Sequence, residues 1–143
     1  MPDSIEKICS NAFYWGATNV VITKIPPNLT TIEQWAFHNC DNVGFDDFGY
    51  SNKLEESGSS FLFDAGINFW QAKKDTIDTN KIIIGKSIKL NKNAFDSYKG
   101  IDYATFCFLG SPADYGYETD YNAATDLGLG SAKYIFNYNP NVI

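Results

Sequence analysis

The chain has 143 residues, of which 44% are hydrophobic and 16% aromatic. This length is typical of one domain, and this composition excludes disorder over most of the chain. The formal net charge is −6 and every basic residue is a lysine, which argues against binding to nucleic acid or anionic membranes, because both require clustered cations. No apolar run approaches the roughly 18 residues of a spanning helix, so we expect no membrane insertion.

The chain begins with Met1-Pro-Asp-Ser-Ile-Glu-Lys7, which has neither the basic nor the apolar region of a signal peptide. Two localisations stay open. The protein is cytoplasmic or virion-associated if it carries no leader, and extracellular or on a cell surface if a leader was removed.

Three widely spaced cysteines, Cys9, Cys40 and Cys107, match no disulfide framework and no zinc pattern. We expect buried free thiols in a reducing compartment.

One apolar frame occurs three times along the chain. Residues 4–13 and 28–37 share it at a spacing of 24, and 87–95 hold a copy that is one residue shorter. A unit of about 24 residues buries its apolar face only against a neighbour, so the frame predicts stacked units with a shared core. Each copy ends in Ala-Phe, at 12–13, 36–37 and 94–95.

The frame also predicts the elements within each unit. The Ala-Phe pair suits a tightly turned helical segment, because Ala permits close approach and Phe fills the layer between units. The inward-pointing apolar pairs are Ile5 with Ile8, Leu29 with Ile32, and Ile88 with Leu90. The apolar stretches that follow, 20–25, 82–84 and 105–109, predict short strands that stack in parallel along one face.

The frame resembles the BspA-type leucine-rich repeats of bacterial and protozoan surface proteins. The resemblance implies an α/β repeat fold, a short irregular leucine-rich-repeat solenoid with parallel β-strands, short helical turns and non-repeat insertions. It also implies recognition or adhesion, with no enzyme activity and no cofactor. The residues that carry it are 2–13, 18–20, 25–26, 29–40, 87–95 and Ile101, and the ending 108–112 with 132–138 is similar to the way such arrays terminate.

The sequence departs from the family pattern at Gly16 and Tyr98, where the family usually has Cys, and the frame is absent between Phe48 and Lys81. An array this short and interrupted argues against the long concave surface of adhesins. The expected organisation is two repeats in 1–48, an irregular insertion in 49–81, a third repeat in 82–109 and a C-terminal capping region in 110–143.

Within the insertion, the polar residues 49–60 predict a loop. Residues 61–63 predict a strand, and 64–74 predict one short helix that is capped by Asp64, with Trp70 packed on the edge of the solenoid. A final strand over 133–138 would close the array.

Two surfaces are candidate binding sites. Tyr115, Tyr117 and Tyr121 lie among Glu118 and Asp120, and tyrosine gives contact area at low entropic cost together with a hydroxyl. The alternative is that these tyrosines cover the end of the solenoid.

The second surface is at the other end. The first unit has no capping element, so its strand edge, marked by Ile5 and Ile8, is a candidate docking edge for a partner or a second copy.

Catalysis and metal binding find no support in the sequence. His38 is the only histidine, and neither Cys40 nor any serine lies in a nucleophile motif. The carboxylates at 46–47 and 118–120 lack the order of a calcium loop, and the glycines at 128 and 130 lack phosphate-loop spacing. We therefore predict no catalytic residue, metal or cofactor.

The sequence thus predicts a non-catalytic module that recognises a protein or glycan on a surface. The alternative is a structural subunit of a larger assembly, such as a decoration, tail or neck protein of a virus or phage particle. The missing secretion signal and the uncapped first unit motivate that alternative. A solution mass separates the two, because an assembly subunit self-associates or needs a partner to cover its edge.

Overall fold

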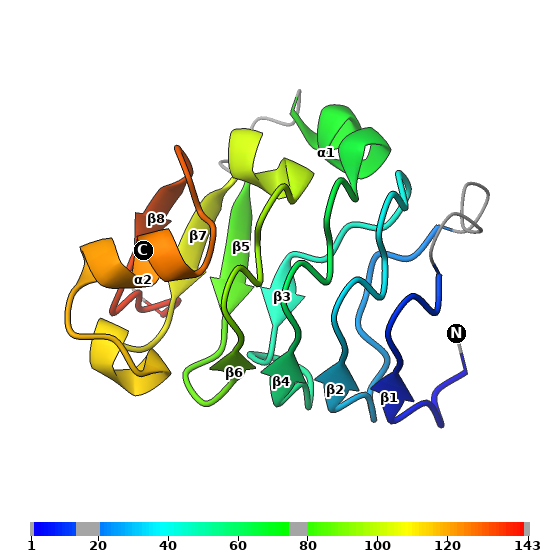
Figure 1. Ribbon diagram of the computed structural model, residues 1–143, viewed down its shortest axis with the longest axis horizontal. Helices are drawn as coiled ribbons and strands as arrows, with labels where there is room; N and C mark the ends of the chain where they lie inside the picture. Colours follow the sequence, from blue (N-terminus) through cyan, green and yellow to red (C-terminus); the bar gives the residue numbers. More distant parts are fainter. Residues whose placement is uncertain (1, 14–20, 75–79, 142–143) are drawn as a thin grey trace.

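The computed structural model describes residues 2–13, 21–74 and 80–141. They form an α/β architecture of two parallel β-sheets with a few short helices. Successive turns of the chain lie side by side from the N-terminal to the C-terminal end (Figure 1). Gly16 and residues 18–20, which the sequence analysis names, lie outside the described residues.

The first sheet has the order β1-β2-β4-β6, and its strands are only two residues long. They are β1 (Lys7–Ile8), β2 (Thr31–Ile32), β4 (Glu56–Ser57) and β6 (Lys89–Leu90). The second sheet has the order β3-β5-β7-β8. Its strands are β3 (Asp47–Phe48), β5 (Lys81–Ile84), β7 (Thr105–Phe108) and β8 (Lys133–Ile135).

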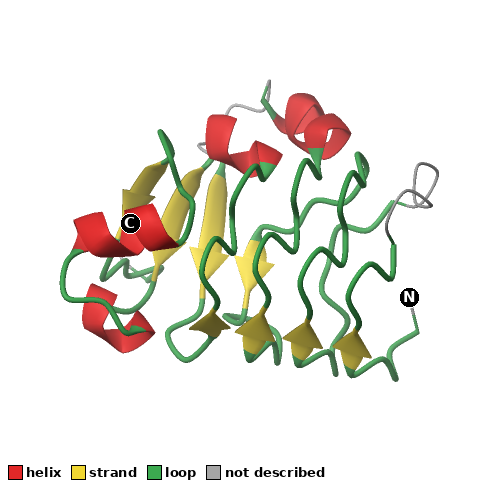
Figure 2. Cartoon of the chain, viewed as in Figure 1, coloured by secondary structure: helices red, strands yellow, loops and turns green. Residues whose placement is uncertain are grey.

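The helices lie outside the two sheets (Figure 2). They are α1 (Ile67–Lys73), α2 (Asp120–Asp126) and the 3-10 helices η1 (Lys99–Asp102) and η2 (Pro112–Tyr115). The described part of the chain contains no helix that is long and apolar enough to cross a membrane.

The parallel register of the first sheet brings four segments of the chain into correspondence. Lys7 pairs with Thr31, Thr31 with Glu56, and Glu56 with Lys89. We refer to 5–13, 29–40, 54–65 and 87–98 as the first to fourth stacked segments. Strand β4, between β2 and β6, comes from the 49–81 region in which the sequence pattern showed no copy of the frame.

Left-handed backbone recurs at corresponding positions of the four segments, three residues after each strand. The residues with positive φ there are Asn11, Trp35, Ser60 and Asn93. Four residues later the conformation recurs at Asn39, Asp64 and Ser97. Asn, Asp and Ser suit these positions, because a short polar side chain tolerates left-handed φ better than a bulky one does. Backbone hydrogen bonds connect these turns, for example from Phe37 N to Phe61 O and from Asp64 N to Ser97 O.

A row of aromatic rings fills the space between the two sheets. Phe37 contacts Phe45 with ring centroids 5.5 Å apart, and Phe45 contacts Phe48 at 6.0 Å. From Phe48 the contacts continue through Phe61, Phe95, Phe106, Phe108 and Phe136. Seven of the twelve largest fully buried side chains are phenylalanine and two are leucine, so Phe rather than Leu dominates the large side chains of the core.

Several predicted elements are confirmed. Strands were expected over 82–84 and 105–109, and β5 and β7 occupy those stretches. The expected final strand is present as β8, shorter than predicted. The strand expected over 20–25 is not confirmed, because the described residues of that stretch, 21–25, form no strand and only Ile22 makes a parallel bridge, to Val43.

Other predicted elements are wrong. Residues 61–63 form a turn rather than a strand, because Ser60 and Asp64 are both in the left-handed region and bend the chain on either side. The Ala-Phe pairs lie in the same kind of turn and not in a helix. Helix α1 has Gly66 as its N-cap with no side-chain capping bond, so Asp64 does not cap it.

The domain boundaries of the sequence analysis stay predictions. Trp70 was expected to pack on the edge of the solenoid. Its indole is buried, and its ring centroid lies 6.1 Å from that of Tyr98.

Candidate functional site

A polar groove of about 320 Å³ crosses all four stacked segments, where the strands of the first sheet lead into the left-handed turns. We call it the corner groove. Its walls combine carboxylates, amides and hydroxyls, which accept and donate hydrogen bonds in many directions. The lining residues are Ser10, Thr31, Ile32, Glu33, Gln34, Glu56, Gly58, Ser59 and Asn91.

Glu33 is held by the first stacked segment. Its Oε1 accepts a hydrogen bond of 3.2 Å from the backbone N–H of Ser10, and its Oε2 lies 3.4 Å from Lys7 Nζ. The bond from Ser10 is the main reason why the pKa of this carboxyl is lowered, and Lys7 adds to the effect. Glu33 is therefore an ionised acceptor in a fixed position at neutral pH.

Glu56 has the same arrangement with the fourth stacked segment. Its Oε2 accepts a 3.2 Å hydrogen bond from Asn91 Nδ2 and lies 3.6 Å from Lys89 Nζ. Asn91 Nδ2 also donates to Ser57 O at 2.8 Å. Each carboxylate in the groove is thus paired with one lysine, and each pair joins neighbouring segments of the chain.

Gly58 keeps the corner groove open at its centre. It corresponds to Glu33 in the second segment, and a Cβ on Gly58 would lie 2.4 Å from the backbone N of Gln34. The chain therefore approaches its neighbour here as closely as only glycine allows. Next to it, Ser57 is fully buried, and its Oγ has no hydrogen-bond partner among the described residues.

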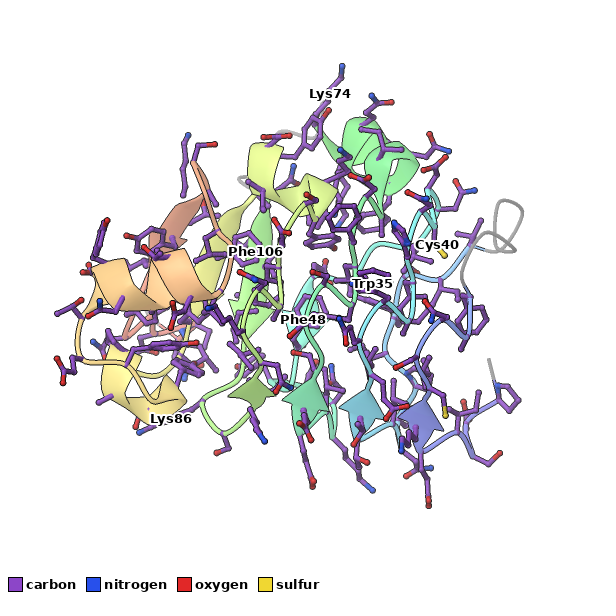
Figure 3. The ribbon with its side chains drawn as sticks, in the orientation of Figure 1. Trp35, Cys40, Phe48, Lys74, Lys86 and Phe106 are labelled. Atoms are coloured by element: carbon purple, nitrogen blue, oxygen red, sulfur yellow. The ribbon has the colours of Figure 1, made fainter. Side chains whose placement is uncertain are left out.

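Trp35 directly follows the lining residue Gln34 and is not itself among the residues that line the groove. It has φ of +59°, and 43% of its surface is exposed. Its ring lies 5.6 Å from that of His38, which in turn makes an edge contact of 5.1 Å with Phe63. Figure 3 labels Trp35 above β2 in the view, between that strand and α1.

Sequence reasoning missed both the corner groove and Trp35, although a signal for Trp35 was present. In the first and third copies of the frame the residue before Ala-Phe is asparagine, Asn11 and Asn93, whereas the second copy has Trp35. The groove itself could not be predicted from the sequence. Two of its lining residues, Gly58 and Ser59, belong to the third stacked segment, in which the sequence shows no copy of the frame.

The structure fixes Tyr115, one of the predicted binding residues, at the end of the core. Its hydroxyl donates to Gly85 O at 3.1 Å and accepts from Gly110 N at 3.0 Å. Its ring contacts those of Phe108 and Phe136. Burial raises the pKa of Tyr115 to about 12.

The other four predicted residues divide between core and solvent. Tyr117 is half-buried against the core, and this burial raises its pKa. Tyr121 is 74% exposed, and Glu118 and Asp120 are also exposed. Of the five, Asp120 lines a cleft of about 370 Å³ beside β8, together with residues 134–137 and Pro112. The structure thus does not gather the five into one pocket.

The predicted docking edge is β1. Ile8 is only 4% exposed and Ile5 is half-buried, so both side chains belong to the core. Glu6 O and Ile8 O accept hydrogen bonds from the second stacked segment. Among the described residues no strand pairs with the other side of β1, so this edge offers backbone groups rather than an apolar patch.

The cysteines do not suggest nucleophilic chemistry. Cys40 and Cys107 are buried as expected, and burial raises the pKa of both thiols, that of Cys40 to about 11. Cys9 is exposed, which corrects the expectation that all three are buried, because it sits at an outward position directly after β1. Within the described ranges no three His, Cys, Asp or Glu residues are grouped so as to hold a metal ion.

Comparison with protein-family models, curated proteins and solved structures finds no match to this chain.

Proposed function

We propose that the chain is a non-catalytic recognition module, built as a short solenoid of BspA-like leucine-rich repeats, that binds a protein or glycan on a surface. The fold part of the proposal is supported by the four stacked segments, which share strand register and left-handed positions. Stacked units of this kind form a continuous surface that one extended ligand contacts at several units.

The corner groove is the single observation that carries the binding function. Its polar side chains come from all four stacked segments, and ion pairs between segments hold the two carboxylates in place. A pre-formed concave surface binds without the loss of side-chain freedom that ordering at an interface otherwise requires. The exposed Trp35 beside it supplies an aromatic anchor of the type that dominates binding energies.

A binding screen tests this function. The immobilised chain is exposed to arrays of glycans and of extracellular proteins, with Ser59→Leu as the matched variant that fills the groove. Ser59 is a half-buried lining residue, so a Leu side chain there occupies the groove, and we expect every specific ligand to be lost in that variant. Ligands that bind both proteins equally would contradict the groove as the binding surface. Circular dichroism confirms that the variant is folded.

The alternative, a structural subunit of a larger assembly, is favoured by β1, whose outer side pairs with no other strand of the described residues. An edge strand presents unpaired N–H and C=O groups that a second chain can extend. Light scattering across a concentration range tests it. Lys7→Pro removes a backbone donor at the edge, and Lys7→Ala removes only the side chain and its ion pair with Glu33. An oligomer that Lys7→Pro disrupts and Lys7→Ala preserves would favour the subunit, and a monomer at all concentrations would contradict it.

A further inference from the structure

We propose that the corner groove, together with Trp35 at its border, is a binding site for an uncharged oligosaccharide. The indole of Trp35 forms a platform for the apolar face of a sugar ring, and the groove binds the hydroxyl groups. This inference rests on the proposed recognition function and names its ligand class.

The backbone at Trp35 is the first step of the argument. The corresponding residues of the other segments are Asn11, Ser60 and Asn93, which tolerate left-handed φ, whereas a bulky side chain there is strained. Such strain costs on the order of 1–3 kcal/mol and concentrates at functional sites. Trp35 does not offset it by full burial, since 43% of the side chain is exposed. Asparagine at position 35 would therefore give the fold at least the same stability as tryptophan.

The second step is the chemistry of the groove. Glu33 and Glu56 are acceptors held by Ser10 and Asn91, and Gln34 adds an amide that both donates and accepts. Sugar hydroxyls also donate and accept, so they match this set of side chains. Because Glu33 and Glu56 already have their hydrogen-bond partners in place, ligand binding does not have to order them.

Charge selects among the sugars. The lysines that reach the two carboxylates of the groove are paired with them, Lys7 with Glu33 and Lys89 with Glu56, and the chain carries a net charge of −6. An acidic or sulfated glycan would meet the like charge of Glu33 and Glu56. The surface therefore favours a neutral glycan.

The span of the groove selects an oligomer. Parallel strands lie about 4.8 Å apart, so the four strands of the first sheet extend over roughly 14 Å. The lining residues come from all four stacked segments. A chain of several sugar rings occupies this length, and a single ring does not.

Titration calorimetry and tryptophan fluorescence test the proposal. The probes are the neutral hexasaccharides cellohexaose, maltohexaose, mannohexaose and chitohexaose, with hexagalacturonate as the anionic control. The variants are Trp35→Asn and, as a matched control at a similarly exposed aromatic that does not line the groove, Tyr50→Asn. A melting curve accompanies each variant.

We expect at least one neutral hexasaccharide to bind and to change the fluorescence, and hexagalacturonate not to bind. Trp35→Asn weakens this binding by about tenfold or more, removes the fluorescence change and leaves the melting temperature equal or higher. Tyr50→Asn leaves the binding unchanged.

Three results would overturn the proposal: no neutral hexasaccharide binds, binding survives Trp35→Asn, or Trp35→Asn melts several degrees lower because Trp35 serves the fold. These failures are distinguishable from failure of the recognition function. A protein ligand that binds the chain and is lost on filling the groove with Ser59→Leu would reject the sugar and keep the recognition module.

Discussion

The second and third stacked segments have the same backbone and dissimilar sequences. Residues 29–40 and 54–65 pair through β2 and β4 in parallel register, and both place left-handed residues at the same two positions. Only the second segment carries the Ala-Phe frame. The comparison shows that a segment is defined by where it buries apolar groups and where it turns, not by which apolar residues it uses.

The packing explains how two different sequences fill one layer. Ala36 and Phe37 correspond to Phe61 and Leu62, and all four are fully buried. The larger ring has moved one position along the chain, and Phe61 now contacts Phe48 and Phe95 with centroids 5.6 and 5.9 Å apart. Cores tolerate such exchange when the total volume and the apolar pattern are kept.

The largest expected effect on stability comes from placing the alanine of the Ala-Phe pair at the corresponding position of the third segment. Phe61→Ala reproduces the alanine of the second segment but leaves a cavity among Phe48 and Phe95, and we expect a loss of about 3–5 kcal/mol in the free energy of unfolding. Urea denaturation measures the loss. Phe63→Ala, at a half-buried site in the same turn, is the matched control and costs less. A loss below about 1 kcal/mol would mean that the frame, and not the local packing, specifies the layer.

The third segment also shows how far sequence reasoning reached. Parallel strands at β5 and β7 were predictable, because continuous apolar runs such as Ile82–Ile84 mark buried strands. Strand β4 was not, because its inward residue is Ser57 and its turn begins with Ser60-Phe61, so neither the apolar spacing nor the Ala-Phe pair is visible. The corner groove depends on β4 and was missed for the same reason.

A second prediction concerns the position after the second left-handed residue, which is Cys40, Ala65 or Tyr98 in successive segments. The buried Tyr98 packs against Trp70 of α1, and its hydroxyl donates to Phe45 O at 2.7 Å and accepts from Trp70 Nε1 at 3.0 Å. Tyr98→Phe leaves these buried groups unpaired, and we expect about 2–3 kcal/mol lower stability in urea. Tyr103→Phe, at a half-buried site, is the control. Equal stability of the two variants would show that the network contributes nothing.

A third prediction uses the inward position of the strands, which is Ile8, Ile32 and Leu90 in three segments and Ser57 in the other. The Ser57 hydroxyl is buried, and among the described residues it has no partner. Ser57→Ala removes an uncompensated polar group, so we expect about 1 kcal/mol higher stability and a higher melting temperature. Ser59→Ala, at a half-buried site in the groove, should leave the melting temperature unchanged. A destabilised Ser57→Ala would indicate that the hydroxyl is bound, for example to a buried water.

The smallest expected effect is a pH dependence of stability caused by Cys40, whose corresponding residue in the third segment is Ala65. Burial raises the pKa of the Cys40 thiol to about 11 from an ordinary value of 9, so the fold favours the protonated form. The stability of the wild type should therefore fall relative to that of Cys40→Ala as the pH rises from 9 to 11, because unfolding releases the proton. Parallel stability curves for the two proteins over this range would contradict it.

Because only thiolates react, brief iodoacetamide treatment at pH 8 should modify the exposed Cys9 and spare Cys40, and peptide mass spectrometry reads this out.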